Sequence, residues 1–168
     1  MSARFRVSWV RAAVTGRQLA PLGLLSILCL PLCSWAQQNK LTVAPADEFS
    51  IKRGASATQT LKVAVLPGFH VNSDKPRDEF LIPLKLTWTG GPLEATAVSY
   101  PKPEEIKVGG QTLVVFTGSF VIRTDFKAPA NAAPGAVKVI GKLHYQACNS
   151  DMCFRPATLE IRLPVVVE

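Results

Sequence analysis

The sequence AVKVIGKLHYQACNSDMCFRPATLEIRLPVVV, residues 136–167, contains two runs of alternating apolar and polar residues on either side of a short polar segment. Apolar side chains recur at every second position, which is typical of β-strands that are buried on one face. The residues between the two cysteines favour a turn. We therefore predict a β-hairpin with strands at 136–148 and 157–167 and with Cys148 and Cys153 opposite each other at its tip.

Other parts of the chain repeat the two-residue period. TQTLKVAVL at 58–66 and GSFVIRTDFKA at 118–128 alternate in the same way, and two short segments, 40–43 and 48–52, are possible further strands. Gly, Pro, Asn and Asp residues separate the runs, as expected for turns. No segment has the spacing of an amphipathic helix. We predict an all-β fold, an antiparallel β-sandwich of seven or more strands, with an α+β domain as the alternative.

The first residues have the features of an export signal. A segment at 1–18 with four arginines and no acidic residue precedes an apolar run at 19–33, and the small residues Ser34 and Ala36 follow. This order is typical of a secretory signal peptide, and the apolar run is shorter than the ~20 residues that span a bilayer. We predict a signal peptide at 1–36 and no stable membrane anchor after its removal.

Removal of this leader leaves one domain, residues 37–168, with a single cysteine pair. Cys29 and Cys33 leave with the leader, and the formal net charge falls from +7 (19 − 12) to +3 (15 − 12). Because no basic stripe with interleaved aromatic residues is present, we do not expect a nucleic-acid partner. Export delivers the domain to an oxidising compartment, where a disulfide persists.

The cysteine pair permits a structural or a redox role. Chain-entropy reasoning gives a bridge that closes so short a loop only ~2 kcal/mol, and a paired hairpin gains less. Exchange instead requires an accessible sulfur that a thiolate can attack. Arg155 would favour a thiolate at Cys153, and Asp151 would oppose it. These considerations leave a structural disulfide and an exchangeable one as competing interpretations.

A copper site is the third interpretation. His144, Cys148, Met152 and Cys153 are ligands that suit Cu(I). On a strand, however, His144 lies ~13 Å from Cys148, too far to share a metal. The other histidine, His70, is interpreted as a surface or strand-end residue. We therefore expect no resident metal and no cofactor.

The hairpin sequence resembles a known family. YQACNSDMCFRP is similar to the active-site hairpin of the amino-terminal periplasmic domain of DsbD, a membrane thiol:disulfide interchange protein. PGFHVNSDKPRDEFLIPLKLTW at 67–88 and YPKPEE at 100–105 are similar to segments of stand-alone relatives of that domain. The residues that match the hairpin pattern are Tyr145, Gln146, Ala147, Cys148, Cys153, Phe154 and Pro156.

The resemblance implies an immunoglobulin-like β-sandwich with a protein-disulfide reductase type of activity in the periplasm. It implies that Cys153 is the attacking thiol and Cys148 the resolving thiol, with Tyr145, Gln146, Phe154 and Pro156 in support. The implied partners are thioredoxin-like proteins, with a separate membrane protein as a possible electron donor. A loop that caps the cysteines is expected near 100–120, where Ile106 and Phe116 are candidates.

The function hypothesis is therefore an exported thiol-disulfide exchange domain that passes electrons between thioredoxin-like partners through Cys148 and Cys153. The alternatives are a non-enzymatic secreted β-sandwich binding module with a structural disulfide, and a Cu(I)-handling domain.

Overall fold

The computed structural model describes residues 39–168, in which every regular element is a β-strand. The expected signal peptide lies outside the described residues. The antiparallel β-sandwich predicted from the alternation is confirmed, as is the immunoglobulin-like fold that the resemblance implied. The strands are β1 (Leu41–Val43), β2 (Phe49–Ile51), β3 (Ser56–Val65), β4 (His70–Asn72), β5 (Lys85–Thr89), β6 (Glu94–Ser99), β7 (Glu104–Val108), β8 (Gln111–Phe116), β9 (Ser119–Lys127), β10 (Gly135–Tyr145), β11 (Ala147–Cys148) and β12 (Ala157–Val167).

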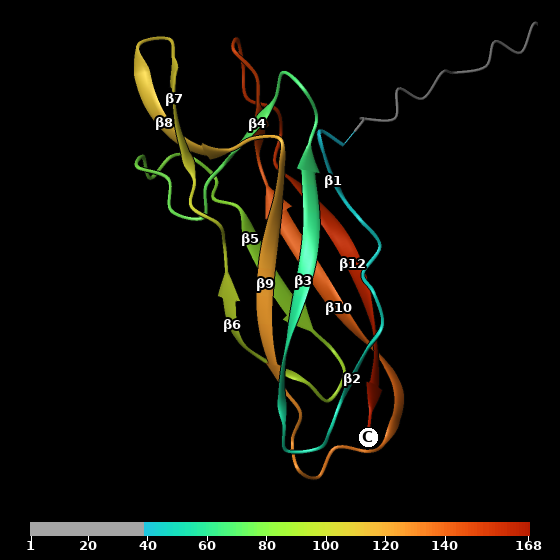
Figure 1. Ribbon diagram of the computed structural model, residues 1–168. Coiled ribbons are helices and arrows are strands. Elements are labelled where there is room, and N and C mark those ends of the chain that lie inside the picture. Colours follow the sequence, from blue (N-terminus) through green and yellow to red (C-terminus); the bar gives the residue numbers. More distant parts are fainter. Residues whose placement is uncertain (1–38) are drawn as a thin grey trace, which may run out of the picture. The chain divides into compact units, whose positions relative to one another are not determined.

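Two four-stranded sheets form the body of the sandwich. One has the order β1-β3-β9-β6 and the other the order β2-β12-β10-β5. Figure 1 shows β3 and β9 side by side on one layer, with β10 and β12 crossing behind them. All pairings in these sheets are antiparallel except that of β2, which runs parallel to β12.

The long hairpin follows the alternation of its sequence. β10 and β12 pair along their full lengths, from Gly135 opposite Val167 to Tyr145 opposite Ala157. In β12 the odd-numbered residues from Ile161 onward are buried and Glu160 and Arg162 are exposed. The period of two thus places one face of each strand in the core.

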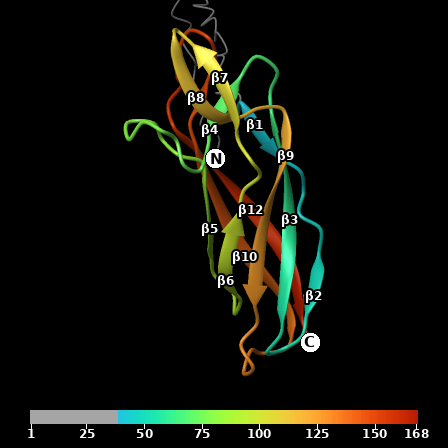
Figure 2. The same cartoon turned by 60° about the vertical axis from the view of Figure 1, so that its left-hand side comes forward.

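The first strand of this hairpin is interrupted, which the sequence did not predict. β10 ends at Tyr145, Gln146 has no strand conformation, and β11 pairs with β4 instead of β12. β11 thereby joins a third sheet with the order β11-β4-β8-β7. Figures 1 and 2 place this small sheet and the tip of the segment between β10 and β12 at the same end of the sandwich, opposite the C-terminus.

Two clusters of buried side chains fill the sandwich. The first includes Leu61, Val71, Ile122, Tyr145 and Ala147 and extends to the small sheet, and the second centres on Phe126, Val139, Leu163 and Val165. Trp88 contacts both clusters, and its indole N–H donates to the hydroxyl of Thr124 at 3.0 Å. The cysteine end is therefore continuous with the core.

Within residues 39–168 we find no helix that is long and apolar enough to cross a membrane.

Candidate functional site: the cysteine hairpin

Cys148 and Cys153 are joined in a disulfide, with their Cα atoms 4.0 Å apart. The two residues form an antiparallel bridge, as the hairpin prediction requires. The N–H of Phe154 donates to the carbonyl of Ala147 at 2.8 Å, and the N–H of Asn149 donates to the carbonyl of Met152 at 3.0 Å. These bonds lie on either side of the cysteines, so the cysteines form a non-hydrogen-bonded pair, the closer of the two types of antiparallel pair. The local pairing therefore brings the sulfur atoms together.

The turn between the cysteines is organised by Asn149. Its side-chain carbonyl oxygen accepts hydrogen bonds from the backbone N–H groups of Asp151 at 2.9 Å and Met152 at 2.8 Å. An asparagine side chain that mimics a backbone turn in this way is common at such positions. The loop is thus ordered by its own residues, and the Met152 side chain remains exposed.

The two cysteines differ in exposure, which the sequence did not predict. Cys148 is only 2% exposed, whereas Cys153 is exposed. Cys148 lies on β11, which pairs with β4 and whose other residue, Ala147, belongs to the first core cluster. An incoming thiolate can therefore reach the sulfur of Cys153 more easily than that of Cys148.

The small sheet has two chemically distinct faces near the disulfide. Directly opposed residues in a sheet lie on the same face, and successive residues lie on opposite faces. His70 is opposite Cys148, which is opposite Cys153, and Asn72 and Gln146 follow two residues away on the same side. We call these five residues the cysteine face. Val71, Ala147 and Phe154 lie on the other, apolar face.

Gln146 connects the chain segments of the cysteine face. Its side-chain N–H donates to the carbonyl of Phe154 at 3.2 Å, and its side-chain oxygen accepts from Asn72 at 3.5 Å. Asn72 also donates to the carbonyl of Ile82 at 3.0 Å. The strand is interrupted at Gln146, and the side chain of Gln146 holds residues 153–156, the return segment that carries Cys153.

His70 lies in the cysteine face and is 5% exposed, so its interpretation as a surface residue was wrong, although it does begin a strand. Its Nε2 atom is buried and has no hydrogen-bond partner. Burial lowers the pKa of His70 below its ordinary value of 6.5. All three residues of β4 are buried, so its two faces are both covered, and alternation in the sequence provided no signal for the burial of His70.

Phe154 anchors the return segment on the apolar face. Its ring packs against Phe69 with ring centroids 5.7 Å apart. The ammonium group of Lys40 lies over both rings, 4.9 Å from the centroid of Phe69 and 5.5 Å from that of Phe154. A cation over aromatic faces stabilises such a cluster. The aromatic residue after Cys153 therefore fixes the segment that carries the exposed sulfur.

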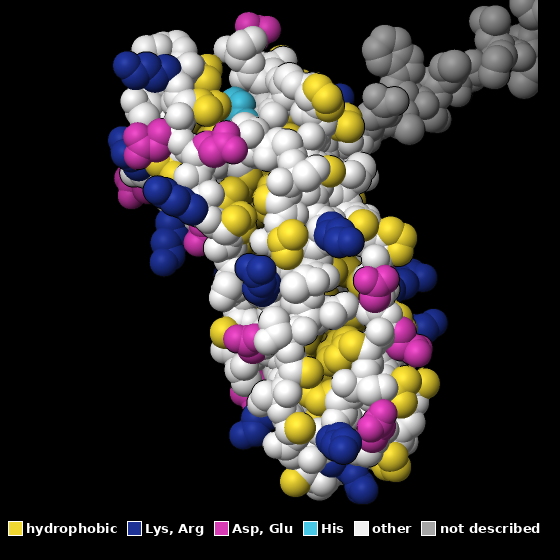
Figure 3. Space-filling view, viewed as in Figure 1, with side chains coloured by type: hydrophobic (Ala, Val, Ile, Leu, Met, Phe, Trp, Pro, Cys, Tyr) yellow, Lys and Arg dark blue, Asp and Glu magenta, His cyan; other side chains and the backbone are white. Residues whose placement is uncertain are grey.

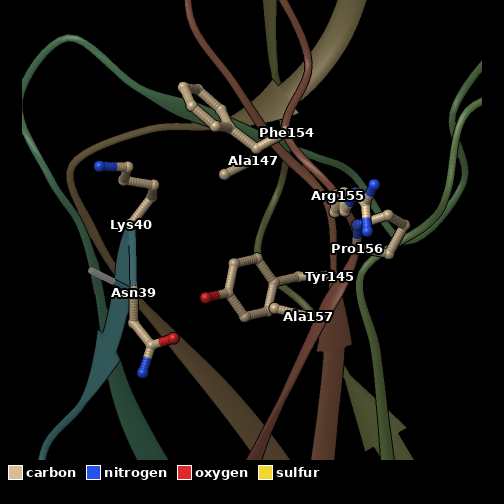
Figure 4. A pocket seen from close by; sticks show the side chains of 8 residues that line it. All are labelled: Asn39, Lys40, Tyr145, Ala147, Phe154, Arg155, Pro156 and Ala157. Atoms are coloured by element: carbon tan, nitrogen blue, oxygen red, sulfur yellow. The ribbon is translucent and has the colours of Figure 1, made fainter. Parts of the chain in front are cut away.

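A small cavity of about 90 Å³ lies beside this cluster. Figure 4 shows the Tyr145 ring within it, Lys40 on one side, and Arg155 and Pro156 on the other. Burial raises the pKa of Tyr145, and a hydrogen bond with the backbone of Leu41 opposes that effect. The six site residues predicted from the sequence thus lie together at one end of the sandwich.

The segment expected to contain a cap is the β7–β8 hairpin. Phe116, one candidate, is buried in the first core cluster, with its ring 4.8 Å from Phe120, whereas Ile106 is half-buried in β7. The carboxylate of Glu105 pairs with Arg77 at 2.6 Å on the exposed side of the hairpin. Figure 3 shows side chains of both charge signs gathered over β7 and β8. Phe116 therefore packs inward and is not a cap.

The possible copper ligands are not gathered around one point. The Nδ1 atom of His144 is 3.0 Å from the hydroxyl of Thr158 on β12, and the sulfur atoms of Cys148 and Cys153 are bonded to each other. Among residues 39–168 no cluster of three or more His, Cys, Asp or Glu side chains could hold a metal ion.

Comparison with known proteins gives a family and a fold. The family described as "Thiol:disulfide interchange protein DsbD, N-terminal" matches residues 37–164. The N-terminal periplasmic domain of ScsB from Proteus mirabilis is similar in structure, with a TM-score of 0.55 and 16% identity over 76% of this chain. The chain spans 47% of that protein chain.

A second solved structure, the reduced DsbD N-terminal domain of Neisseria meningitidis, has a TM-score of 0.43 and 16% identity, covering 66% of this chain and 79% of its own. A search of curated proteins gave no match.

Proposed function

The chain belongs to the family of DsbD N-terminal domains, and from this premise we propose that it carries electrons between thioredoxin-like proteins in the periplasm through Cys148 and Cys153. Family membership supports a role in thiol-disulfide interchange. The direction of transfer, the partners and the roles of the two cysteines belong to the proposal. The proposal includes export by a signal peptide at 1–36 and a mature domain at 37–168.

The observation that carries this proposal is the unequal exposure of the two bonded cysteine residues. Thiol-disulfide exchange requires in-line attack by a thiolate on one sulfur while the other leaves. Cys153 is exposed on the return segment and Cys148 is buried in β11. An exposed sulfur that joins to partners and a buried sulfur that resolves the mixed disulfide are what such a carrier needs. A purely structural bridge does not require this asymmetry.

Two exchanges complete one cycle. A reduced donor attacks Cys153, the bond to Cys148 breaks, and Cys148 leaves as a thiolate that takes up a proton. The donor's second thiolate then attacks its own sulfur in the mixed disulfide, which releases an oxidised donor and a reduced domain. The reduced Cys153 thiolate next attacks the disulfide of an acceptor, and Cys148 resolves the product. Two electrons pass from donor to acceptor, and the Cys148–Cys153 disulfide is restored.

The remaining motif residues have supporting roles in this scheme. Gln146 and Phe154 hold the return segment through the hydrogen bond and ring contact described above. Tyr145 and Pro156 line the cavity beside it. We propose that this framework keeps Cys153 presented to partners while the disulfide opens and closes, and that the activity is of the protein-disulfide reductase type.

Trapping of mixed disulfides tests the cysteine roles. In Cys148→Ser the attacking thiol remains and cannot be resolved, so we expect a stable mixed disulfide with a reactive thioredoxin-like protein. In Cys153→Ser we expect little trapping, because the remaining thiol is buried. Non-reducing electrophoresis followed by peptide mapping measures both. Equal trapping by the two variants would contradict the role assignment and leave the redox function standing.

The reduction potential separates this function from a structural disulfide. A structural bridge typically has a potential below about −300 mV and resists exchange. We expect the Cys148–Cys153 bridge to exchange with reduced thioredoxin at a higher potential. A lower potential together with no exchange would favour the binding-module hypothesis.

A further inference from the structure

The three side chains in the centre of the cysteine face form a row across the small sheet. His70 on β4 is opposite Cys148 on β11, and Cys148 is opposite Cys153 on the return segment. Directly opposed residues have Cβ atoms ~4.5–5.5 Å apart, so an imidazole and a sulfur at such positions are within reach of each other by side-chain rotation. The buried sulfur therefore has an imidazole on one side and the exposed sulfur on the other.

The imidazole of His70 has a buried nitrogen with no partner. Buried polar atoms are almost always hydrogen-bonded, so each exception requires an explanation. In the disulfide form the sulfur of Cys148 carries no proton and offers the Nε2 atom nothing to accept. Reduction creates an S–H donor on Cys148, the residue paired with His70. The S–H group formed on reduction is a donor of the kind that the unpartnered nitrogen lacks in the disulfide form.

We propose that His70 is the proton acceptor and donor for Cys148, the resolving thiol. This inference rests on the proposed function and adds a third reacting group to it. When Cys148 resolves a mixed disulfide on Cys153, its S–H proton passes to the Nε2 atom of His70. The resulting thiolate attacks the sulfur of Cys153, the Cys148–Cys153 bond forms, and the partner leaves as a thiolate. In the reverse direction His70 takes up a proton from solvent and gives it to the departing Cys148 thiolate.

Burial explains why Cys148 needs such a group. The thiolate is the nucleophile, and an apolar, buried environment disfavours its formation. Cys148 is 2% exposed, so water has little access to its proton. A neutral imidazole accepts a proton, and burial keeps His70 in that neutral form by lowering its pKa. The exposed Cys153 has no comparable need, because solvent can take its proton.

The charged groups near this row lie on its borders. The carboxylate of Glu104 accepts a hydrogen bond from Thr117, which directly follows β8, the neighbour of β4. Asp151 lies in the turn between the cysteines, and Lys40 lies over the rings of Phe69 and Phe154 on the apolar side. Glu104 lies on the same side of the small sheet as the cysteine face, because it is opposite Val115, which is opposite Asn72. Among the five residues of the cysteine face itself, His70 is the titratable side chain besides the two cysteines.

Two-step oxidation by a dipyridyl disulfide tests the proposal. The first thiopyridone is released when Cys153 attacks the reagent, at a rate proportional to reagent concentration. The second is released when Cys148 resolves the adduct, at a rate independent of that concentration. Replacing Cys29 and Cys33 by serine in every protein makes Cys148 and Cys153 the sole thiols. Stopped-flow absorbance then measures the two steps separately on one reduced chain.

In His70→Gln we expect the second step to slow by about a hundredfold at neutral pH, the lower end of what a positioned acid or base contributes. The first step should change less than about twofold. The slowed step should regain speed as pH rises, because hydroxide replaces the lost proton acceptor. His144→Gln is the matched control, since His144 is exposed on β10 and should alter neither step.

The kinetic results distinguish an error in the role of His70 from an error in the proposed function. An unchanged second step in His70→Gln, or an equal slowing of both steps, would overturn the role of His70 and leave the proposed function intact. Absence of both steps in the reduced protein with native histidines would refute the proposed function itself.

NMR of the protein with its native histidines tests the proposal without requiring that the His70→Gln variant folds. Histidine ring signals in NMR spectra report the titration of His70 in the oxidised and reduced protein. We expect this titration to change on reduction. Identical titration of His70 in both states would contradict the proposal.

Discussion

The two ends of the sandwich are built differently. At the end with the C-terminus, β10 and β12 pair over eleven residues each, and Phe126, Leu163 and Val165 fill the space between the sheets. At the cysteine end, β11 has two residues and β4 has three. There, hydrogen bonds that involve the side chains of Gln146, Asn72 and Asn149 take the place of extended backbone pairing. One end is held by repeated backbone pairing, and the other by a few specific contacts.

This difference separates stability from exchange. Long ladders and buried apolar area resist local opening, whereas short strands open at lower free energy. A disulfide that must open and close requires surroundings that tolerate small movements without unfolding the domain. The short strands β4 and β11 provide those surroundings, while the long hairpin anchors them through Tyr145 and Ala147 in the first core cluster.

The largest effect is expected from Phe126→Ala. Phe126 is fully buried, and its ring contacts Trp88 and Phe49 with centroid distances of 5.2 and 6.1 Å. Loss of a buried phenylalanine costs about 3–5 kcal/mol in free energy of unfolding. Urea denaturation of the oxidised protein measures it. Met152→Ala at the exposed tip is the control and should change stability by less than about 0.5 kcal/mol.

If Met152→Ala destabilised the domain as much as Phe126→Ala, the turn would be part of the core, and the distinction between the two ends would be wrong.

The second effect concerns reduction of the disulfide. Because the bridge closes a short loop, its loss should lower the free energy of unfolding by about 2 kcal/mol or less. We expect hydrogen exchange to accelerate in β4 and β11 and to stay nearly unchanged in the middle of β10 and β12. Exchange measured by mass spectrometry in both redox states checks this. Equal acceleration throughout the chain would mean that the disulfide stabilises the whole domain.

The sequence predicted the end with the long pairing of β10 and β12 far better than the cysteine end. In the segment at 157–167, apolar side chains at every second position determine which face is buried, so local alternation was sufficient there. The strand at 136–148 was predicted as continuous, but β10 ends at Tyr145, because Gln146 bonds to Phe154 and Asn72. Asn72 lies 74 residues from Gln146, and no local pattern encodes a contact over that separation.

The sequence brought together only those site residues that belong to one local motif. Tyr145, Gln146, Cys148, Cys153, Phe154 and Pro156 belong to one short motif and were found together. His70, Asn72 and Lys40 come from other segments and join the site only through pairing of β4 and packing of the N-terminal segment. The exposure of the cysteines also depends on that pairing, because β4 covers Cys148 and leaves Cys153 free.

A smaller effect is expected from Gln146→Ala. The variant loses the hydrogen bond to the carbonyl of Phe154 and the longer one to Asn72, at a net cost of about 1 kcal/mol. Thermal unfolding of the oxidised protein measures this loss. Thr158→Ala is a matched control on the long hairpin, since it removes one exposed side-chain contact, to His144. A larger loss in Thr158→Ala than in Gln146→Ala would contradict the structural role of Gln146.

The smallest effect is expected from the titration of one buried group, His70. Burial lowers the pKa of His70 in the folded protein, whereas the unfolded chain has the ordinary value near 6.5. Between these two pKa values the unfolded state binds more protons, so the free energy of unfolding rises with pH. The stability from neutral His70 is complete above about pH 6.5 and is lost as the pH falls toward the folded pKa. Urea denaturation of the oxidised protein across this range should show less pH dependence in His70→Gln than in His144→Gln, because His144 is exposed. An equal pH dependence in the two variants would mean that burial does not lower the pKa of His70 in the native domain, and the buried, neutral imidazole on which the proposal relies would be absent.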